Sequence, residues 1–79
     1  MGDFPVEKMR QLTELAYLAE GFVEVKAINF EGDTPLEENA TAVALLADGY
    51  RFFDENYYGV GFERLGRIAV FVKGHSLQK

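Results

Sequence analysis

The spacing of apolar residues changes at Gly21, and this change constrains the fold more than any other feature of the chain. Over residues 5–19 apolar side chains recur at three-to-four spacing, which is the period of an amphipathic helix. After Gly21, Val23, Val25 and Ala27 alternate with charged residues, which is the two-residue period of a half-buried strand. The sequence therefore predicts a helix over 5–19, followed directly by a strand over 21–30.

The expected ends and sides of this first helix follow from its residues. Asp3 is the predicted N-cap, and Gly21 is expected to end the helix. The apolar stripe contains Val6, Met9, Leu12, Leu15, Ala16 and Ala19, whereas Lys8, Arg10, Gln11 and Glu14 are expected on the wetter side.

A second helix is predicted over residues 35–47. Thr34 has the properties of an N-cap, and Glu37 follows it at the spacing of a capping box. The alternative for residues 41–53 is a pair of strands, because an Asp-Gly pair within this segment favours a hairpin turn. We favour the helix because the segment is rich in alanine, which is depleted in strands.

The rest of the chain is typical of strands. Residues 50–53 are rich in aromatic rings, 60–63 form a short candidate strand, and 66–73 are a continuous run with β-branched residues. The turn between the last two strands is expected at residues 64–66. These elements predict an α+β fold in the order α-β-α-β-β-β, with two helices on a small, mostly antiparallel sheet of three or four strands. With 79 residues, the chain is expected to form a single domain, residues 1–79.

The charges are unevenly distributed. Residues 1–63 carry all 13 acidic residues and four basic ones, whereas residues 64–79 carry four basic residues and no acidic one. An acidic body repels the phosphates of nucleic acids, so we expect no direct binding of a nucleic acid. Such a charge pattern is typical of a solvated surface that favours solubility, and the alternative is an acidic face that docks on a basic protein partner. The chain has no cysteine and no apolar stretch that could span a bilayer, so we expect a cytoplasmic protein without a membrane partner.

Few residues suit catalysis or metal binding. The only serine and the only histidine are the neighbours Ser76 and His75, which is a poor arrangement for a nucleophile and its base. One histidine and no cysteine argue against a zinc site. The paired carboxylates lack the apolar surroundings that would raise a pKa for acid and base chemistry. We therefore expect neither an enzyme, nor a metal, nor a cofactor. The two carboxylate pairs are Glu37-Glu38 and Asp54-Glu55.

Aromatic residues are concentrated between residues 50 and 62, where six of the eleven rings of the chain occur. Tyrosine and arginine beside acidic residues are common at the centres of protein interfaces. The phenylalanines of this stretch fit a core equally well. We expect the three tyrosines to form an exposed patch with a charged rim. The predicted partner-binding residues are therefore Tyr50, Arg51, Asp54, Glu55, Tyr57 and Tyr58.

These features favour a small, acidic, non-enzymatic protein-binding module. One form of it is an inhibitor, of the kind that phages and mobile elements encode, which occludes a basic nucleic-acid-handling host protein. This form is an analogy of size and charge. The alternative is a structural or accessory subunit that self-associates, for instance as a homodimer, through its aromatic surface and its sheet edge.

Overall fold

The structure is a computed structural model that describes residues 5–76 of the chain. It confirms the predicted α+β class, with two helices and a three-stranded antiparallel sheet. The first helix and the first strand lie where the apolar periods predict them. The elements are α1 (Val6–Ala19), β1 (Phe22–Glu31), the 3-10 turn η1 (Leu36–Glu38), α2 (Ala40–Ala47), β2 (Arg51–Val60) and β3 (Glu63–Ser76).

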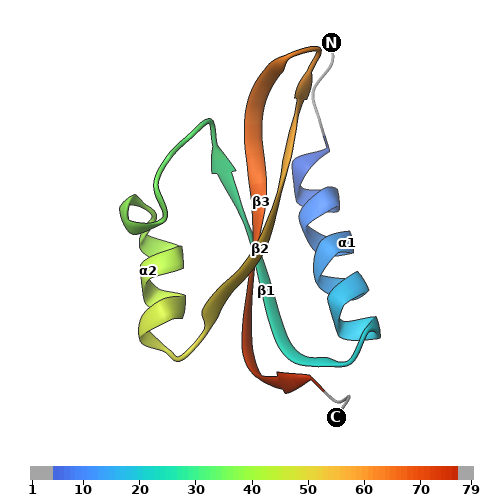
Figure 1. Cartoon of the computed structure of the whole chain (residues 1–79), viewed down its shortest axis with the longest axis vertical. Coiled ribbons are helices and arrows are strands. Elements are labelled where there is room, and N and C mark those ends of the chain that lie inside the picture. Colours follow the sequence, from blue (N-terminus) through green and yellow to red (C-terminus); the bar gives the residue numbers. More distant parts are fainter. Residues whose placement is uncertain (1–4, 77–79) are drawn as a thin grey trace.

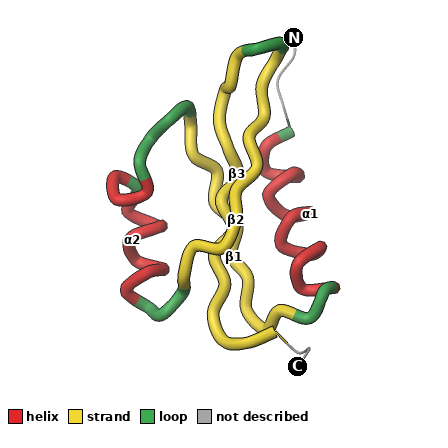
Figure 2. The backbone as a smooth tube through the Cα atoms, in the orientation of Figure 1, coloured by secondary structure: helices red, strands yellow, loops and turns green. Residues whose placement is uncertain are grey.

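The three strands form one sheet in the order β1-β3-β2, and both neighbouring pairs are antiparallel. The sheet is strongly twisted, and the two helices lie on opposite sides of it (Figures 1 and 2). The described chain therefore has three layers, with β3 at the centre of the middle one and β1 and β2 at its two edges.

Strand β3 is buried on both faces of the sheet. Its residues 68–72 are at most 2% exposed, and alternate side chains of a strand point to opposite faces. This double burial explains why the strand is a continuous apolar run rather than an alternating one. The cluster on the α1 side contains Val25, Val70 and Val72 with Tyr17 and Phe22 against it, and the cluster on the α2 side contains Phe30, Ala42, Tyr50, Ala69 and Phe71.

The second helix is present but begins later than the sequence predicts. The η1 turn comes first, and α2 begins at Ala40, where the side chain of Asn39 accepts a hydrogen bond of 2.9 Å from the Ala42 amide. The predicted capping box does not form, because the Thr34 hydroxyl donates to the Glu31 carbonyl instead. The alternative of paired strands over residues 41–53 is wrong, since Ala40–Ala47 is helical.

The long hairpin of β2 and β3 differs from the prediction of three separate strands after Gly49. Residues 50–53 and 60–63 were expected in different strands, but β2 runs unbroken from Arg51 to Val60. The turn is at Gly61-Phe62 rather than at residues 64–66, and Gly61 has a φ of 61°. Bulges at two points of β2 interrupt the regular alternation of side chains between the two faces of the sheet. For this reason the sequence pattern suggests two short strands instead of one long strand. In Figure 1 the turn projects beyond both helices at one end of the molecule.

Helix α1 packs on the sheet through a mixed side, on which polar residues lie between the half-buried Val6, Met9 and Tyr17. Arg10, Thr13 and Glu14 are half-buried against the sheet, whereas Leu12 and Leu15 are exposed. The expectation that Arg10 and Glu14 lie on the wet side is therefore wrong, although Lys8 and Gln11 are exposed as predicted. The predicted N-cap, Asp3, lies outside the described residues. Neither described helix is long and apolar enough to cross a membrane.

Two polar residues of this side of α1 bind the backbone of the edge strand β1. The Ala27 amide donates to Oε2 of Glu14 at 2.7 Å, and Nη1 of Arg10 donates to the Ala27 carbonyl at 3.1 Å. Arg10 and Glu14 are also ion-paired at 2.8 Å. Together they satisfy backbone groups that an edge strand would otherwise leave to solvent.

Candidate protein-binding surface

Exposed apolar side chains follow the edge strand β2 and continue into its turn. Four of them are 39–62% exposed, and Phe62 in the turn is completely exposed. Large exposed apolar groups that lie along one element are typical of interaction sites. We call this set the β2 surface, and it contains Phe52, Phe53, Tyr57, Val60 and Phe62.

The two neighbouring phenylalanines are anchored on opposite faces of the sheet. The ring of Phe52 lies 5.9 Å from that of Phe71 on the α2 side. The ring of Phe53 lies 5.8 Å from Tyr17 and 5.0 Å from Phe22 on the α1 side. Aromatic pairs at these centroid distances stabilise one another, so each ring is held by its inner part while the rest stays accessible.

A bulge at Phe53 sets the direction of the residues after it. Phe52 is paired with Phe71 of β3, whereas Asp54 is paired with Val70, so Phe53 is an extra residue. Phe53 and Asp54 consequently both reach Tyr17, whose hydroxyl donates to Oδ2 of Asp54 at 3.1 Å. Burial raises the pKa of Tyr17, and the hydrogen bond to Asp54 raises it further.

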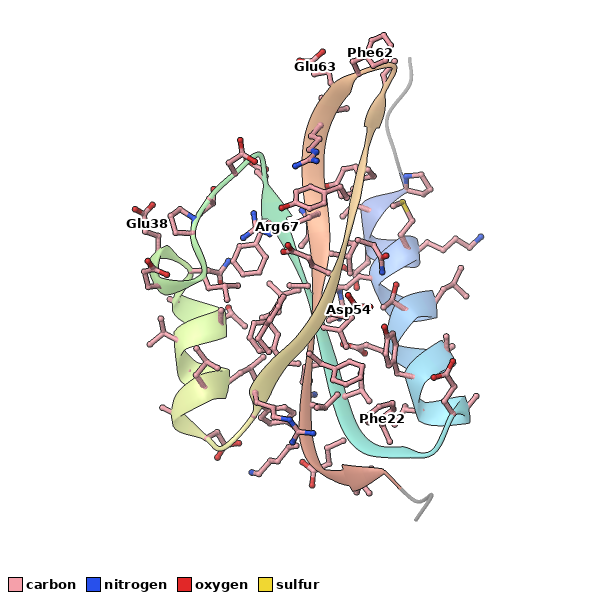
Figure 3. The ribbon with its side chains drawn as sticks, viewed as in Figure 1. Phe22, Glu38, Asp54, Phe62, Glu63 and Arg67 are labelled. Atoms are coloured by element: carbon pink, nitrogen blue, oxygen red, sulfur yellow. The ribbon has the colours of Figure 1, made fainter. Side chains whose placement is uncertain are left out.

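At the other end of β2, Tyr57 and the turn are held by contacts with β3. The guanidinium of Arg64 lies 4.2 Å from the centre of the Tyr57 ring. Gly59 allows the strands to approach closely, because a Cβ there would lie 1.8 Å from the carbonyl oxygen of Glu63. Phe62 points away from the sheet at the tip of the hairpin (Figure 3). The turn thus presents a large ring without any contact that hides it.

Beneath the β2 surface, Arg67 is 6% exposed and binds three different groups. Its Nε lies 2.8 Å from Oε1 of Glu55, in an ion pair whose N–H direction is not that of a hydrogen bond. Its terminal nitrogens donate to the carbonyls of Gly32 and Thr34, at 3.3 and 2.7 Å. Its guanidinium also lies over the Phe30 ring. Arg67 therefore attaches the loop after β1 to the centre of the sheet.

Two of the six predicted binding residues are tyrosines whose hydroxyls bind other residues of the chain. Tyr50 is only 8% exposed, so the expectation of an exposed ring is wrong there. Its hydroxyl donates to Oε1 of Glu24, and the Lys73 ammonium lies 5.4 Å from its ring. Burial raises the pKa of Tyr50, and the hydrogen bond to Glu24 adds to the effect. Tyr58, also expected to be exposed, is half-buried, and its hydroxyl donates to Asn29.

The other four predicted residues lie at or near the surface. Arg51, Asp54 and Tyr57 are exposed, and Glu55 is half-buried because of its ion pair with Arg67. The structure thus brings Asp54 and Tyr57 to the β2 surface, together with rings that the sequence did not distinguish from core residues. The sequence did contain a signal for one of these rings, Phe62. A Gly-X pair between two strand-like segments favours a two-residue turn, and Gly61-Phe62 is such a pair.

Three basic residues of the C-terminal segment contact other side chains of the same chain. Arg64 covers Tyr57, Arg67 is paired with Glu55, and Lys73 lies 3.3 Å from Asp48. The last residue of β1 and the loop and turn between β1 and α2, in contrast, carry four exposed acids and no basic residue. These acids, together with Glu63 at the hairpin tip, leave the described surface predominantly acidic. They are Glu31, Asp33, Glu37 and Glu38.

Within residues 5–76, no group of three or more acidic or histidine side chains is placed to hold a metal ion. Comparisons with protein-family models, with curated proteins and with solved structures found no match. A function for the β2 surface therefore has to follow from its own geometry and chemistry.

Proposed function

We propose that this protein is a small, non-enzymatic protein-binding module of the cytoplasm that docks on its partner through the β2 surface. The observation that carries the proposal is the row of exposed apolar side chains along β2, which ends on the completely exposed Phe62. Rings that are anchored on one side and accessible on the other lose little conformational freedom on binding, so they suit the centre of an interface.

The charges around this surface favour a basic partner. Asp54 and Glu63 flank the exposed rings, and the acidic loop after β1 is tied to β3 by a hydrogen bond from the Gly32 amide to the Leu65 carbonyl. Complementary charge steers such partners together and sets the orientation of the complex. More specifically, the module occludes the basic surface of a nucleic-acid-handling protein, as an inhibitor of the phage type does.

The test is capture of proteins from an extract of the source cells on the immobilised chain. The wild type is expected to retain a small set of basic proteins, and fewer of them at high salt because salt screens the acidic residues. The double variant Tyr57→Ser with Phe62→Ser removes two exposed rings without touching the core, so it is expected to lose this set.

The matched control is Val43→Ser, which removes an exposed apolar side chain on α2, outside the β2 surface. It is expected to retain the same proteins as the wild type. If the Tyr57→Ser, Phe62→Ser variant captures the wild-type set, the β2 surface is not the docking site. Capture that is unchanged by salt would exclude the electrostatic part of the proposal.

The position of β2 at the edge of the sheet favours a second candidate, an accessory subunit that self-associates through the same rings. The two bulges of β2 weigh against it, because they disturb the regular edge that strand pairing needs. A self-associated form that dissociates in Phe53→Ser would favour this candidate over the first.

A further inference from the structure

The end of the β2–β3 hairpin extends beyond the rest of the sheet. The last pair between β1 and β3 is Glu31 with Gly66, and Gly66 also pairs with Tyr58 of β2. Residues 59–65 therefore lie beyond the end of β1, and they project past both helices at one end of the molecule (Figure 1). We call residues 57–65 the hairpin tip.

Both faces of the hairpin tip carry exposed apolar side chains. Arg64 pairs with Gly59 of β2 and its guanidinium lies over the Tyr57 ring, so Tyr57 and Arg64 share one face. The next pair, Val60 with Glu63, points to the opposite face, because neighbouring residues of a strand alternate. Tyr57 is 42% and Val60 62% exposed. A flat partner can cover only one of these faces, whereas a cleft covers both.

The hairpin tip is fixed to the sheet at its base. The Tyr58 hydroxyl donates to Asn29 of β1, and a Cβ on Gly66 would lie 2.5 Å from that hydroxyl. Tyr58 therefore lies directly against the backbone of β3. The Gly32 amide donates to the Leu65 carbonyl at 3.0 Å, which joins the loop after β1 to the tip. A support that is already ordered loses little conformational freedom when it binds a partner.

Acidic side chains lie around the hairpin tip. Glu63 is beside the completely exposed Phe62 (Figure 3), while Glu31 and Asp33 lie at the base of the tip, at the end of β1 and in the loop after it. The three carboxylates are exposed, and none has an ion-pair partner among the described residues. Arg64 is the one basic residue of the tip. Three anions near one exposed ring are complementary to a cleft with basic walls.

A single-stranded nucleic acid presents the same combination of groups. Proteins that bind single strands hold them in a basic groove, where aromatic side chains stack on the bases. Proteins that read duplex DNA instead place a convex helix or β-ribbon in the groove of the DNA, so they offer no cleft of this kind. In the hairpin tip, the Phe62 ring can take the place of a base. The surrounding carboxylates can take the place of phosphates.

We propose that the hairpin tip inserts into the single-strand-binding groove of a nucleic-acid-handling protein, with Phe62 against an aromatic side chain of the groove and Glu63 against its basic wall. The insertion rests on the proposed function, because it specifies which end of the β2 surface enters the partner. It makes the protein a direct competitor of single-stranded nucleic acid.

The first test is competition on the immobilised wild-type chain, after capture from a nuclease-treated extract of the source cells and washing. Single-stranded oligothymidylate is expected to release the captured proteins at a concentration at least tenfold lower than duplex DNA of the same length requires. Polyglutamate is the control, because it supplies negative charge without bases, and it is expected to release far less. Proteins that the oligothymidylate leaves bound, or that duplex DNA or polyglutamate releases equally well, would overturn the proposal.

The second test measures the affinity of one released protein for variants of the chain. Phe62→Ser is expected to raise the dissociation constant at least tenfold, whereas the matched control Phe62→Tyr keeps a ring and is expected to bind as the wild type does. Phe62 is completely exposed, so neither change disturbs the core. Equal affinities of Phe62→Ser and the wild type would contradict the insertion of this ring.

The third test is hydroxyl-radical footprinting of the same complex. An inserted hairpin tip is expected to lose reactivity at Tyr57, Val60 and Leu65 together, because the cleft covers both faces. Protection of Tyr57 without Val60, or of Val60 without Tyr57, would show that the partner covers one face only, and it would overturn the insertion.

Insertion and docking are separable in these experiments. A wild type that captures no protein would overturn both the proposed function and the insertion. Proteins that are lost in the double variant Tyr57→Ser with Phe62→Ser, but that oligothymidylate does not release from the wild type, would overturn the insertion alone and leave the β2 surface as the docking site.

Discussion

Arg67 shows how one side chain joins three parts of this small fold. It lies in the central strand, pairs with Glu55 of β2 and binds the carbonyls of Gly32 and Thr34 in the loop after β1. The planar guanidinium can meet all these groups at once because its donors point in fixed, different directions. In the sequence, Arg67 is one of four basic residues near the C-terminus, and only the structure distinguishes its role.

Replacing Arg67 by alanine is expected to lower the free energy of unfolding by roughly 2–4 kcal/mol, because two loop carbonyls and a half-buried carboxylate lose their partner. Urea unfolding measures the change. Arg64→Ala is the matched control: Arg64 is an exposed arginine of the same strand, and its loss is expected to cost at most about 1 kcal/mol. Equal losses in the two variants would contradict the role assigned to Arg67.

At the scale of elements, the two edge strands of the sheet differ in how their exposed backbone is covered. On β1, the side chains of Glu14 and Arg10 bind the backbone of Ala27 and so protect part of that edge. On β2, bulges interrupt the edge and aromatic side chains stand along it. The helix on the protected edge exposes Leu12, Leu15 and Leu18, and the other edge carries the β2 surface.

The attachment of α1 to β1 can be tested by amide hydrogen exchange. Glu14→Ala removes the acceptor of the Ala27 amide, so the exchange rate of this amide is expected to rise at least tenfold. Glu7→Ala is the control, because Glu7 also pairs with Arg10 but does not contact Ala27. Arg10 lowers the pKa of Glu7, so the control also removes a charged partner of that arginine. If both variants exchange at the same rate, Glu14 does not secure this edge.

At the scale of the whole molecule, the two helices cover the two faces of one buried strand. The core is divided into two clusters by the sheet, and each is completed by a tyrosine, Tyr17 on the α1 side and Tyr50 on the α2 side. Both hydroxyls donate to carboxylates at the surface. Tyr17 thus links α1 to β2, and Tyr50 links the start of β2 to β1.

These two buried tyrosines make the free energy of unfolding depend on pH in the alkaline range. Burial raises the pKa of Tyr17 and of Tyr50, so the folded state holds these two protons more tightly than the unfolded state does. Their contribution is fully present below the unfolded pKa of about 10, and it is lost as pH rises through the higher folded pKa values. The free energy of unfolding is therefore expected to fall above about pH 10.

Urea unfolding between about pH 8 and pH 11 measures this dependence. The double variant Tyr17→Phe with Tyr50→Phe is expected to be less stable at pH 8 but to lose less stability as pH rises. A variant whose stability falls in parallel with that of the wild type would show that other groups, such as lysines, cause the alkaline transition.

The sequence by itself determined the class of fold and much of its order. The helix predicted over 5–19 is α1 (Val6–Ala19), and the strand predicted over 21–30 is β1 (Phe22–Glu31). Residues 66–73, predicted as a strand from their continuous apolar run, lie in β3. The period of apolar residues and the preferences of alanine and of β-branched residues act over a few neighbouring residues, so they can be read without the rest of the chain.

Only the tertiary structure decided which side of α1 meets the sheet, that Tyr50 is buried, and that residues 50–53 and 60–63 belong to one bulged hairpin. Each of these depends on contacts between distant residues, such as Glu14 with Ala27 and Tyr50 with Glu24. The residues of the candidate site differ between the sequence prediction and the structure for the same reason. Aromatic residues look alike in a sequence whether they fill a core or cover a surface, and their burial depends on which strand and helix lie against them.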